Sequence, residues 1–381
     1  MSKFEGSQLK QLLDRPSLSS KASKIVLGGG SFTHQSHPNP ETLPVRQIIQ
    51  RALDSGIRTF DTSPYYGPSE ELLGDAFSQP GVLANYQRNE YVLMTKVGRI
   101  KALEFDYSPA WVRKSIERSL SRLGTKYLDV VFCHDIEYVT TKAAVTAVGV
   151  LFELVLEGKI KYVGVSGYAI EQLIEVAKAA RSTYGIPLDT VQCWGQLTLQ
   201  NSRMEEEGFP GLHKAGVDTL FCSSPLVIGL LRSQGVPIGT LGDWHPAPPG
   251  LRQAVRTASL WAEEQGHNLA GIALRYSTWK CFDQSDKTSG YNLIIASNSV
   301  EELDSNIQSI SSILRSTDHE DRKYDDVRDL AVLDTEKIAV FLPLFEHIRK
   351  MLGSWVNYSF QSPDEGWDTQ SQTMQSDKKV D

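Results

Sequence analysis

Residues 58–67 read RTFDTSPYYG: a short apolar run ends at Asp61, and Tyr66 follows in the turn after it. Two later runs, 91–95 and 128–133, end in the same way, each on one ionisable residue. The four polar residues associated with these run ends are Asp61, Tyr66, Lys96 and His134. In a barrel of parallel strands, the C-terminal strand ends converge on one face, where chemistry collects. A phenol, an ammonium, a carboxylate and an imidazole on that face indicate an acid/base centre.

Outward from this stretch, strand-length apolar runs alternate with segments of helical period from about residue 24 to about residue 315. The expected strands lie near residue 27 and at 58–61, 91–96, 127–134, 162–166, 190–197, 218–226 and 292–297. The expected helices lie at 45–53, around 72–77, after Ser108-Pro109, and at 141–157, 169–184, 205–215, 251–265, 268–278 and 300–314. Alternating strands and helices imply parallel pairing, and eight such units predict a closed α/β barrel, a (β/α)8 TIM barrel. A doubly wound sheet would want GxGxxG, which the glycine run at 28–32 does not match.

The segment after the barrel has a different character. Residues 315–329 carry mixed charges, which predicts a solvated linker or helix. An apolar helix is expected around 336–352, packed on the body as a C-terminal helical extension. We therefore expect one domain over 1–360 and a disordered polar tail over 361–381.

Composition excludes several classes of function. The 381 residues are 40% hydrophobic and 22% charged, with a net charge of −7, which is typical of a soluble globular protein. Such a charge gives no positive field for a phosphate backbone, so no nucleic acid is expected. The four cysteines form no Cys-x-x-Cys pair, so neither a disulfide framework nor a metal site is expected. Without an apolar leader or a run of about 18 apolar residues, we expect no membrane association and a cytoplasmic location. Oligomeric state is left open.

Several motifs occur in order along the chain. They are DTSPYYG at 61–67, TKV at 95–97, VFCH at 131–134, VGVS at 163–166, VQ at 191–192, SPL at 224–226, and IAS at 295–297 followed by Asn306. In these motifs the chain resembles the aldo-keto reductases over roughly residues 24–310. The resemblance implies that Tyr66 transfers the proton, with Asp61, Lys96 and His134 around it.

The chemistry of these side chains agrees with those roles. A free tyrosine has a pKa of about 10, and a contacting ammonium is expected to lower it. Asp61 would keep Lys96 charged and aimed, and His134 would orient the reacting oxygen. Taken singly, each residue is more often a turn or surface residue, or, for His134, a satisfied half-buried histidine. Of the adjacent pair Tyr65 and Tyr66, one is expected to serve packing, and the resemblance selects Tyr66 as the base.

The resemblance also implies a nicotinamide cofactor, because no side chain can carry hydride. Family members hold the nicotinamide amide with a Ser-Asn pair and a glutamine, which here are Ser166, Gly167 and Gln192. Ser223 stands where a tyrosine usually stacks on the ring, so Trp194 is an alternative stacking partner. The implied cofactor-binding residues are Ser166, Gln192, Ser223, Pro225, Leu226, Ser297, Glu302 and Asn306.

The adenosine end distinguishes the two nicotinamide cofactors. Relatives that use NADPH present a lysine and an arginine to the 2′-phosphate, and those positions here are Ala296 and Glu302. Glu302 would repel a phosphate, whereas a ribose hydroxyl could donate to its carboxylate. NAD is therefore the expected cofactor. Alternatively, Glu302 forms a capping box with Ser299.

The substrate is expected to be a sugar. Leu230-Leu231 and residues 243–248, DWHPAP, are similar to the aldose 1-dehydrogenase branch. That similarity implies NAD-dependent oxidation of D-arabinose at C1 to D-arabinono-1,4-lactone, with L-galactose or L-fucose as alternatives. Trp244, His245 and His34 are candidate substrate contacts, although a loop packed on the barrel rim would equally explain Trp244 and His245. An NADPH-dependent aldehyde reductase and a non-catalytic nucleotide-binding subunit are the other classes considered.

Overall fold

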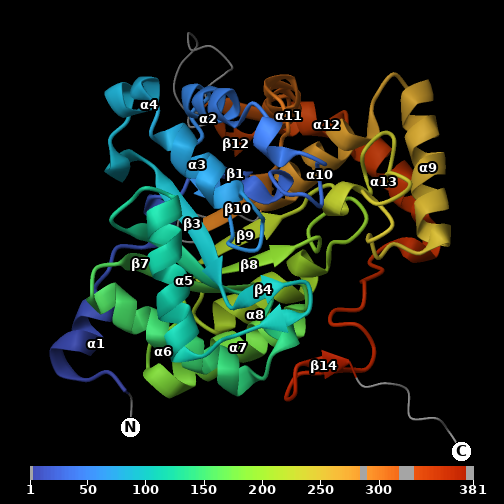
Figure 1. The fold of residues 1–381 in the computed structure, drawn as a ribbon. Coiled ribbons are helices and arrows are strands. Elements are labelled where there is room, and N and C mark those ends of the chain that lie inside the picture. The colour runs from blue at the N-terminus through green and yellow to red at the C-terminus, as the bar shows by residue number, and fades with distance from the viewer. Residues whose placement is uncertain (1–2, 284–289, 317–329, 375–381) are drawn as a thin grey trace, which may run out of the picture.

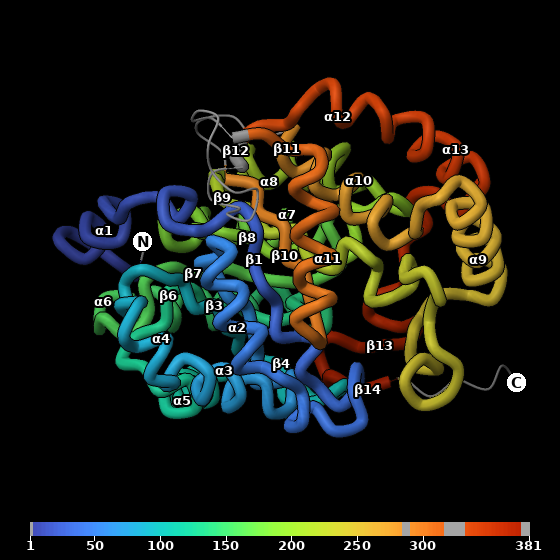
Figure 2. The backbone as a smooth tube through the Cα atoms, turned by 90° about the horizontal axis from the view of Figure 1, so that it is seen from above, coloured from blue at the N-terminus to red at the C-terminus, as the bar shows by residue number. Residues whose placement is uncertain are grey.

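The computed structural model describes residues 3–283, 290–316 and 330–374. Its centre is a closed barrel of parallel strands in the order β1-β10-β9-β8-β7-β6-β3-β2 (Figures 1 and 2). The strands are β1 (Ile25–Gly28), β2 (Thr59–Asp61), β3 (Val92–Val97), β6 (Leu128–His134), β7 (Ile160–Gly167), β8 (Thr190–Trp194), β9 (Thr219–Ser223) and β10 (Gly290–Ile295). The expected (β/α)8 barrel is confirmed. The strands expected at 190–197 and 218–226 end earlier, at Trp194 and Ser223.

Helices surround the barrel (Figure 2). They are α2 (Val45–Asp54), α3 (Ser69–Phe77), α5 (Pro109–Arg122), α6 (Thr141–Leu156), α7 (Ile170–Tyr184), α8 (Phe209–Lys214), α9 (Pro249–Glu264), α10 (Leu269–Asp283) and α11 (Val300–Ser311). The start of α5 is as expected, because the Ser108 hydroxyl accepts a hydrogen bond from the backbone of Trp111. Within the described ranges, no helix is both long and apolar enough to cross a membrane.

The barrel interior fixes which strand residues reach the mouth. Val92, Met94, Val130, Phe132 and Phe221 belong to the smaller of two buried apolar clusters, separate from the strand–helix core. Side chains along a strand alternate between the two faces of a sheet. Lys96 lies two residues after Met94 and His134 two after Phe132, so both point inward above this apolar floor.

Several short helices and strands were not predicted from the sequence. A helix, α1 (Gly6–Leu13), precedes β1 and packs beside α6. A helix α4 (Pro80–Asn85) follows α3, and a hairpin of β4 (Arg99–Lys101) and β5 (Glu104–Phe105) follows β3. Elements of two to eight residues are too short to establish a clear hydrophobic period.

The C-terminal extension is more divided than expected. The charged stretch at 315–329 lies mostly outside the described residues, while β11 (Leu314–Ser316) and β12 (Leu330–Leu333) on its flanks pair antiparallel. The single apolar helix expected around 336–352 is two helices, α12 (Thr335–Ala339) and α13 (Leu342–Leu352). Pro343 in the first turn of α13 fits this break, since proline suits a helix start. Figure 1 shows α13 beside α9.

The structure differs from the expected disordered tail over residues 361–374. This segment carries a small antiparallel ribbon of β13 (Trp367–Asp368) and β14 (Thr373–Met374). The indole N–H of Trp367 donates to the backbone oxygen of Tyr138 at 2.9 Å. The hydrogen bond of Trp367 therefore attaches this segment to the rest of the protein, although its composition is polar. Residues 375–381 of the expected tail lie outside the described residues.

Candidate active site

Strand ends bring the predicted acid/base residues to one mouth of the barrel. Asp61 is the last residue of β2, Lys96 lies near the end of β3, and His134 is the last residue of β6. These three strands are neighbours in the barrel. Tyr66 follows β2 in the turn, where it is half-buried. The structure thus brings together all four residues singled out from the sequence.

Lys96 and Asp61 form a buried ion pair. The Lys96 Nζ donates to Asp61 Oδ1 at 2.8 Å and Oδ2 at 2.7 Å, and to the backbone oxygen of Thr62 at 2.9 Å. An ammonium has three protons, so these bonds use its full donor capacity. Burial raises the pKa of Asp61, although Lys96 and the amide of Gln192 act to lower it.

The Tyr66 hydroxyl has no hydrogen-bond partner within the described residues. The Lys96 Nζ lies 5.1 Å from the centroid of the Tyr66 ring. Burial, followed by the negative charges of Asp61 and Asp135, raises the pKa of Tyr66 well above its ordinary value. The expected lowering of this pKa is therefore not found: burial raises it most, and the charges of Asp61 and Asp135 act in the same direction.

His134 is held as a neutral ring. Its Nδ1 lies 3.1 Å from the hydroxyl of Ser63, and its Nε2 lies 3.5 Å from Asp135 Oδ2. The ring centroids of His134 and Tyr66 are 5.7 Å apart, in an edge-to-face arrangement. Burial lowers the pKa of His134 to about 3, so the imidazole is uncharged near neutrality. It can offer one N–H to a substrate oxygen without carrying charge.

An acidic residue directly after His134 extends this centre. Asp135 is buried, adopts a left-handed φ of 54°, and forms an ion pair with Arg99 of the β4–β5 hairpin. Burial opposes ionisation of Asp135, but His134 and Arg99 hold its pKa below the usual range. A non-glycine residue in this region is uncommon and carries backbone strain. The strain places a carboxylate beside His134.

The adjacent tyrosines have different surroundings. The Arg99 guanidinium carbon lies 4.1 Å from the ring centroid of Tyr65, and the Tyr65 hydroxyl accepts a hydrogen bond from Gln35 at 3.0 Å. Tyr65 is thereby held by packing and a cation–π contact. Tyr66 has its hydroxyl free beside His134. This geometry supports Tyr66 as the proton-transfer group.

Residues expected at the nicotinamide lie on neighbouring strands. Ser166 pairs with Gln192 across β7 and β8, and both are buried. The Gln192 Nε2 donates to Asp61 Oδ2 at 3.2 Å, whereas its Oε1 is buried without a partner among the described residues. Such an acceptor fits the amide N–H of a nicotinamide. Ser223 is half-buried, and the Trp194 ring centroid lies 4.2 Å from that of Tyr168.

Residues expected at the adenosine form a tied turn after β10. The Asn306 Nδ2 donates to the backbone oxygen of Ala296 and to the hydroxyl of Ser297, each at 3.1 Å. The Ser299 hydroxyl caps α11 by accepting from the backbone of Glu302. The Glu302 Oε2 accepts from the backbone N–H of Asn298 at 2.7 Å. The capping box expected for Glu302 is therefore half formed: Ser299 caps the helix, but the Glu302 carboxylate accepts from Asn298 rather than from the backbone of Ser299.

The loop after β9, which carries Pro225 and Leu226, is strained. Ser224, Val227 and Ile228 have φ values of 58°, 50° and 52°. Left-handed conformations are costly for β-branched residues and tend to cluster at functional sites. A hydrogen bond of 2.9 Å joins the backbone oxygen of Val227 to Nε2 of His245 and braces the turn.

The candidate sugar contacts are not equally supported. Both ring nitrogens of His245 are engaged by backbone, at Val227 and at Ala247, so His245 serves loop packing. Its expected role as a substrate contact is corrected accordingly. Trp244 is 42% exposed on the same loop. His34 is exposed, with its Nε2 3.4 Å from Glu41 Oε1.

Four residues of the centre were not identified from the sequence: Ser63, Arg99, Asp135 and Glu137. Ser63 lies inside the opening motif, and the stretch His-Asp-Ile-Glu at 134–137 puts two acidic residues within three positions of His134 in the sequence. Those acidic neighbours were the available signal. Arg99 offered none, because a short hairpin brings it to the site.

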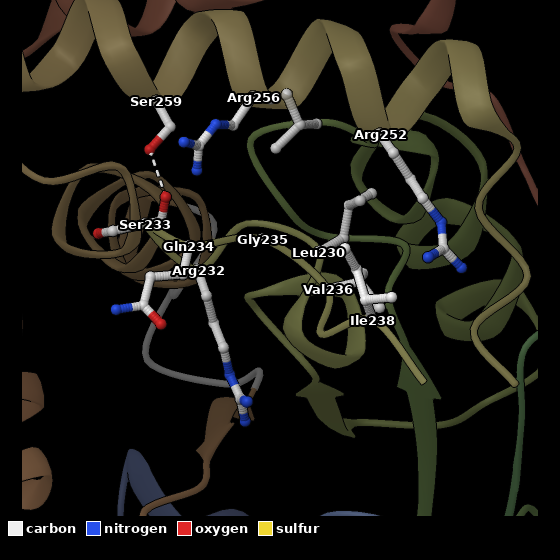
Figure 3. A pocket seen from close by; sticks show the side chains of 11 residues that line it. Leu230, Arg232, Ser233, Gln234, Gly235, Val236, Ile238, Arg252, Arg256 and Ser259 are labelled. Carbon is white, nitrogen blue, oxygen red and sulfur yellow. Dashed lines mark hydrogen bonds between the residues drawn. The ribbon is translucent and has the colours of Figure 1, made fainter. Parts of the chain in front are cut away.

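Two hollows lie away from these residues. One, of about 560 Å³, is at the N-terminal strand ends, lined by residues that include Val92 and Ile160. The other, of about 210 Å³, lies between α9 and the loop at 230–238 (Figure 3). It carries Arg232, Arg252 and Arg256, but Figure 3 shows their guanidinium groups pointing in different directions. Neither hollow contains the acid/base residues.

The sequence of this chain is similar to those of known proteins. Residues 24–323 match the Aldo/keto reductase family. The chain is 39% identical to D-arabinose 1-dehydrogenase of Saccharomyces cerevisiae over 258 residues, which cover 67% of this chain and 75% of the relative. It is 32% identical to L-galactose dehydrogenase of Arabidopsis thaliana over 268 residues, which cover 70% of this chain and 77% of the relative.

Proposed function

The chain belongs to the aldo/keto reductase family, whose members use nicotinamide cofactors, and from this premise we propose that it is an NAD-dependent aldose 1-dehydrogenase. Its substrate is D-arabinose, oxidised at C1 to D-arabinono-1,4-lactone. The observation that carries the proposal is the free hydroxyl of Tyr66 beside neutral His134, above the buried Asp61–Lys96 pair. The likeness to a protein named D-arabinose 1-dehydrogenase supports the choice of sugar.

In the proposed mechanism, the proton leaves the oxygen of the C1 hydroxyl and the hydride leaves the C1 carbon. Tyr66, as the phenolate, takes the proton of the C1 hydroxyl, and His134 donates its N–H to orient that oxygen. A nicotinamide held by Ser166 and Gln192 would supply the hydride acceptor, and the positive charge of its oxidised form would favour the phenolate of Tyr66. Loss of one proton and one hydride converts the cyclic hemiacetal to the lactone. The Ser63 hydroxyl, 3.1 Å from Nδ1, holds the imidazole in place and leaves Nε2 to carry the N–H.

NAD rather than NADP is proposed from the adenosine end of the site. Ala296 and Glu302 supply no cation there, and Glu302 adds a carboxylate that would repel a 2′-phosphate. Gln192, with its unpartnered Oε1, and Ser166 would hold the nicotinamide amide. Ser297 and Asn306 would support the adenosine side.

The cellular setting belongs to the same proposal. We place the enzyme in the cytoplasm, acting on a small sugar. All four cysteines are buried and outside disulfides, which suits a reducing compartment.

An NADH-release assay tests substrate and cofactor together. With NAD, D-arabinose should give a higher kcat/KM than L-galactose, L-fucose and D-xylose. With D-arabinose, NAD should show a KM at least about tenfold below that of NADP, because about 1.4 kcal/mol of charge repulsion is worth tenfold.

Each alternative class predicts a different result in that assay. A lower KM for NADP would favour an aldehyde reductase. Nucleotide binding without sugar-dependent NADH would favour a non-catalytic subunit. Faster turnover of L-galactose or L-fucose would keep the enzyme class and change the sugar.

The oxidation rate should rise continuously from pH 6 to pH 9. Tyr66 must lose its proton to act as base, and burial with Asp61 and Asp135 raises its pKa, so the phenolate fraction grows with pH. Below that pKa the increase approaches about tenfold per pH unit. Initial rates of NADH formation at saturating sugar and NAD measure this dependence. A rate that is flat or falls over this range would exclude Tyr66 as the base.

A further inference from the structure

A buried carboxyl group lies beside the residues proposed to hold the nicotinamide. Glu137 is in the short turn after β6 and is 3% exposed. Its Oε1 accepts hydrogen bonds from the backbone N–H of Tyr168 at 2.8 Å and from the hydroxyl of Ser362 at 3.1 Å. Its Oε2 is buried and has no partner among the described residues. Oε1 of Glu137 is therefore fixed by hydrogen bonds, whereas Oε2 is available to a ligand.

Glu137 explains the glycine at position 167. A Cβ added to Gly167 would lie 2.2 Å from Glu137 Oε2 and 3.1 Å from the carboxyl carbon. No side chain fits at 167 while Glu137 keeps its place. The amide atoms of an asparagine lie two covalent bonds, or roughly 2.4 Å, from its own Cβ. The Oε2 atom of Glu137 thus lies at about the distance from this Cβ at which the amide atoms of an asparagine at 167 would lie.

The neighbours of Gly167 point to the same ligand. Gly167 directly follows Ser166, whose partner on β8 is Gln192. Gln192 Oε1 and Glu137 Oε2 are both buried and both without partners in the described part of the chain. Unpartnered buried polar atoms are rare in native proteins and invite a ligand. Gln192 Oε1 can only accept, so its ligand must bring an N–H or O–H donor, and a carboxamide supplies an N–H.

Glu137 is suited to the complementary role of donor. Burial and the negative charge of Asp135 raise the pKa of Glu137 to about 8, so the carboxyl is protonated at neutral pH. A protonated carboxyl has one O–H to give, and Oε1 is already accepting from Tyr168 and Ser362. A primary carboxamide offers both a carbonyl acceptor and an N–H donor.

We propose that Glu137 binds the carboxamide of the nicotinamide, in place of the side chain that Gly167 lacks. Glu137 donates from Oε2 to the amide oxygen, and Gln192 accepts from the amide nitrogen. This assignment rests on the proposed function, because it requires a nicotinamide cofactor. Ser362, from the C-terminal segment, keeps the carboxyl in place from the opposite side.

Titration calorimetry with two ligands tests the assignment without using turnover. NAD carries the carboxamide, whereas ADP-ribose lacks the nicotinamide. Glu137→Ala should weaken NAD about tenfold and change ADP-ribose less than about twofold, the size expected for one buried hydrogen bond. Glu137→Ala combined with Gly167→Asn should return NAD to within about threefold of the wild type, since the new amide occupies the vacated space.

Further variants separate this role from folding. Glu137→Gln keeps the shape and should retain NAD to within about threefold. Glu70→Gln removes a different buried carboxylate, bonded to Thr95, and should change neither ligand. Gly167→Asn alone should weaken NAD, because two side chains then compete for one space.

The contrary outcomes are distinct. Equal weakening of NAD and ADP-ribose by Glu137→Ala, or no weakening of NAD, would overturn the role of Glu137. Unchanged NAD affinity in Gly167→Asn would also overturn it. A wild-type protein that binds neither ligand would instead overturn the proposed function.

Discussion

We expect Tyr66→Phe to lower kcat for sugar oxidation by about 10²–10⁴-fold, the usual contribution of a positioned acid/base group. Phenylalanine keeps the ring that packs against His134 and removes only the hydroxyl. That hydroxyl bonds to nothing in the described residues, so the free energy of unfolding should be unchanged. Steady-state NADH formation and urea unfolding on the same preparation measure both effects.

Tyr65→Phe is the matched control for that experiment. It removes one hydroxyl from the neighbouring ring and costs only the hydrogen bond from Gln35. At least about a tenth of the activity should remain, because one exposed hydrogen bond is worth only about 0.5–1.5 kcal/mol. If Tyr65→Phe were the inactive variant and Tyr66→Phe the active one, the base would be reassigned.

The second large effect is on stability. Lys96→Met should lower the free energy of unfolding by about 3–5 kcal/mol, the cost of removing one partner of a buried ion pair. The side chains of Lys96 and Asp61 are only 1% and 4% exposed, so the Asp61 carboxylate would stay buried without its cation. Urea unfolding at pH 7 measures the loss.

Two further variants test the cause of that loss. Asp61→Asn combined with Lys96→Met should recover much of the stability, because no charge is then buried. Lys159→Met, which removes the surface pair with Glu117, should cost only about 0–1 kcal/mol. A loss below about 1 kcal/mol in Lys96→Met would contradict the account of the pair.

The barrel and its acid/base residues could be predicted because both depend on local signals. An apolar run of strand length fixes the strand, and a polar residue two positions past an inward-facing side chain must reach the mouth. Lys96 and His134 follow this rule, because they lie two positions after the inward-facing side chains of Met94 and Phe132. What the alternation could not predict is which partners each side chain finds. For Lys96 the partner is Asp61, and it is the burial of Tyr66, together with the charges of Asp61 and Asp135, that raises the pKa which the sequence predicted would be lowered.

The missed residues depend on contacts distant in sequence. Ser362 reaches Glu137 across 225 positions, and no periodicity marks either residue. His245 illustrates the converse, since its type suggested a ligand contact while both ring nitrogens are satisfied by backbone. In both cases the role of the residue depends on which of its polar atoms have hydrogen-bond partners, and only the three-dimensional structure shows this.

The C-terminal segment has a consequence for biosynthesis. The backbone of Phe360 donates to the Tyr168 hydroxyl at 2.8 Å, and Trp367 is bonded to Tyr138, so residues 360–367 complete the rim of the mouth. This segment is translated after all eight strands. The rim of the mouth can therefore be completed only after every strand of the barrel has been synthesised.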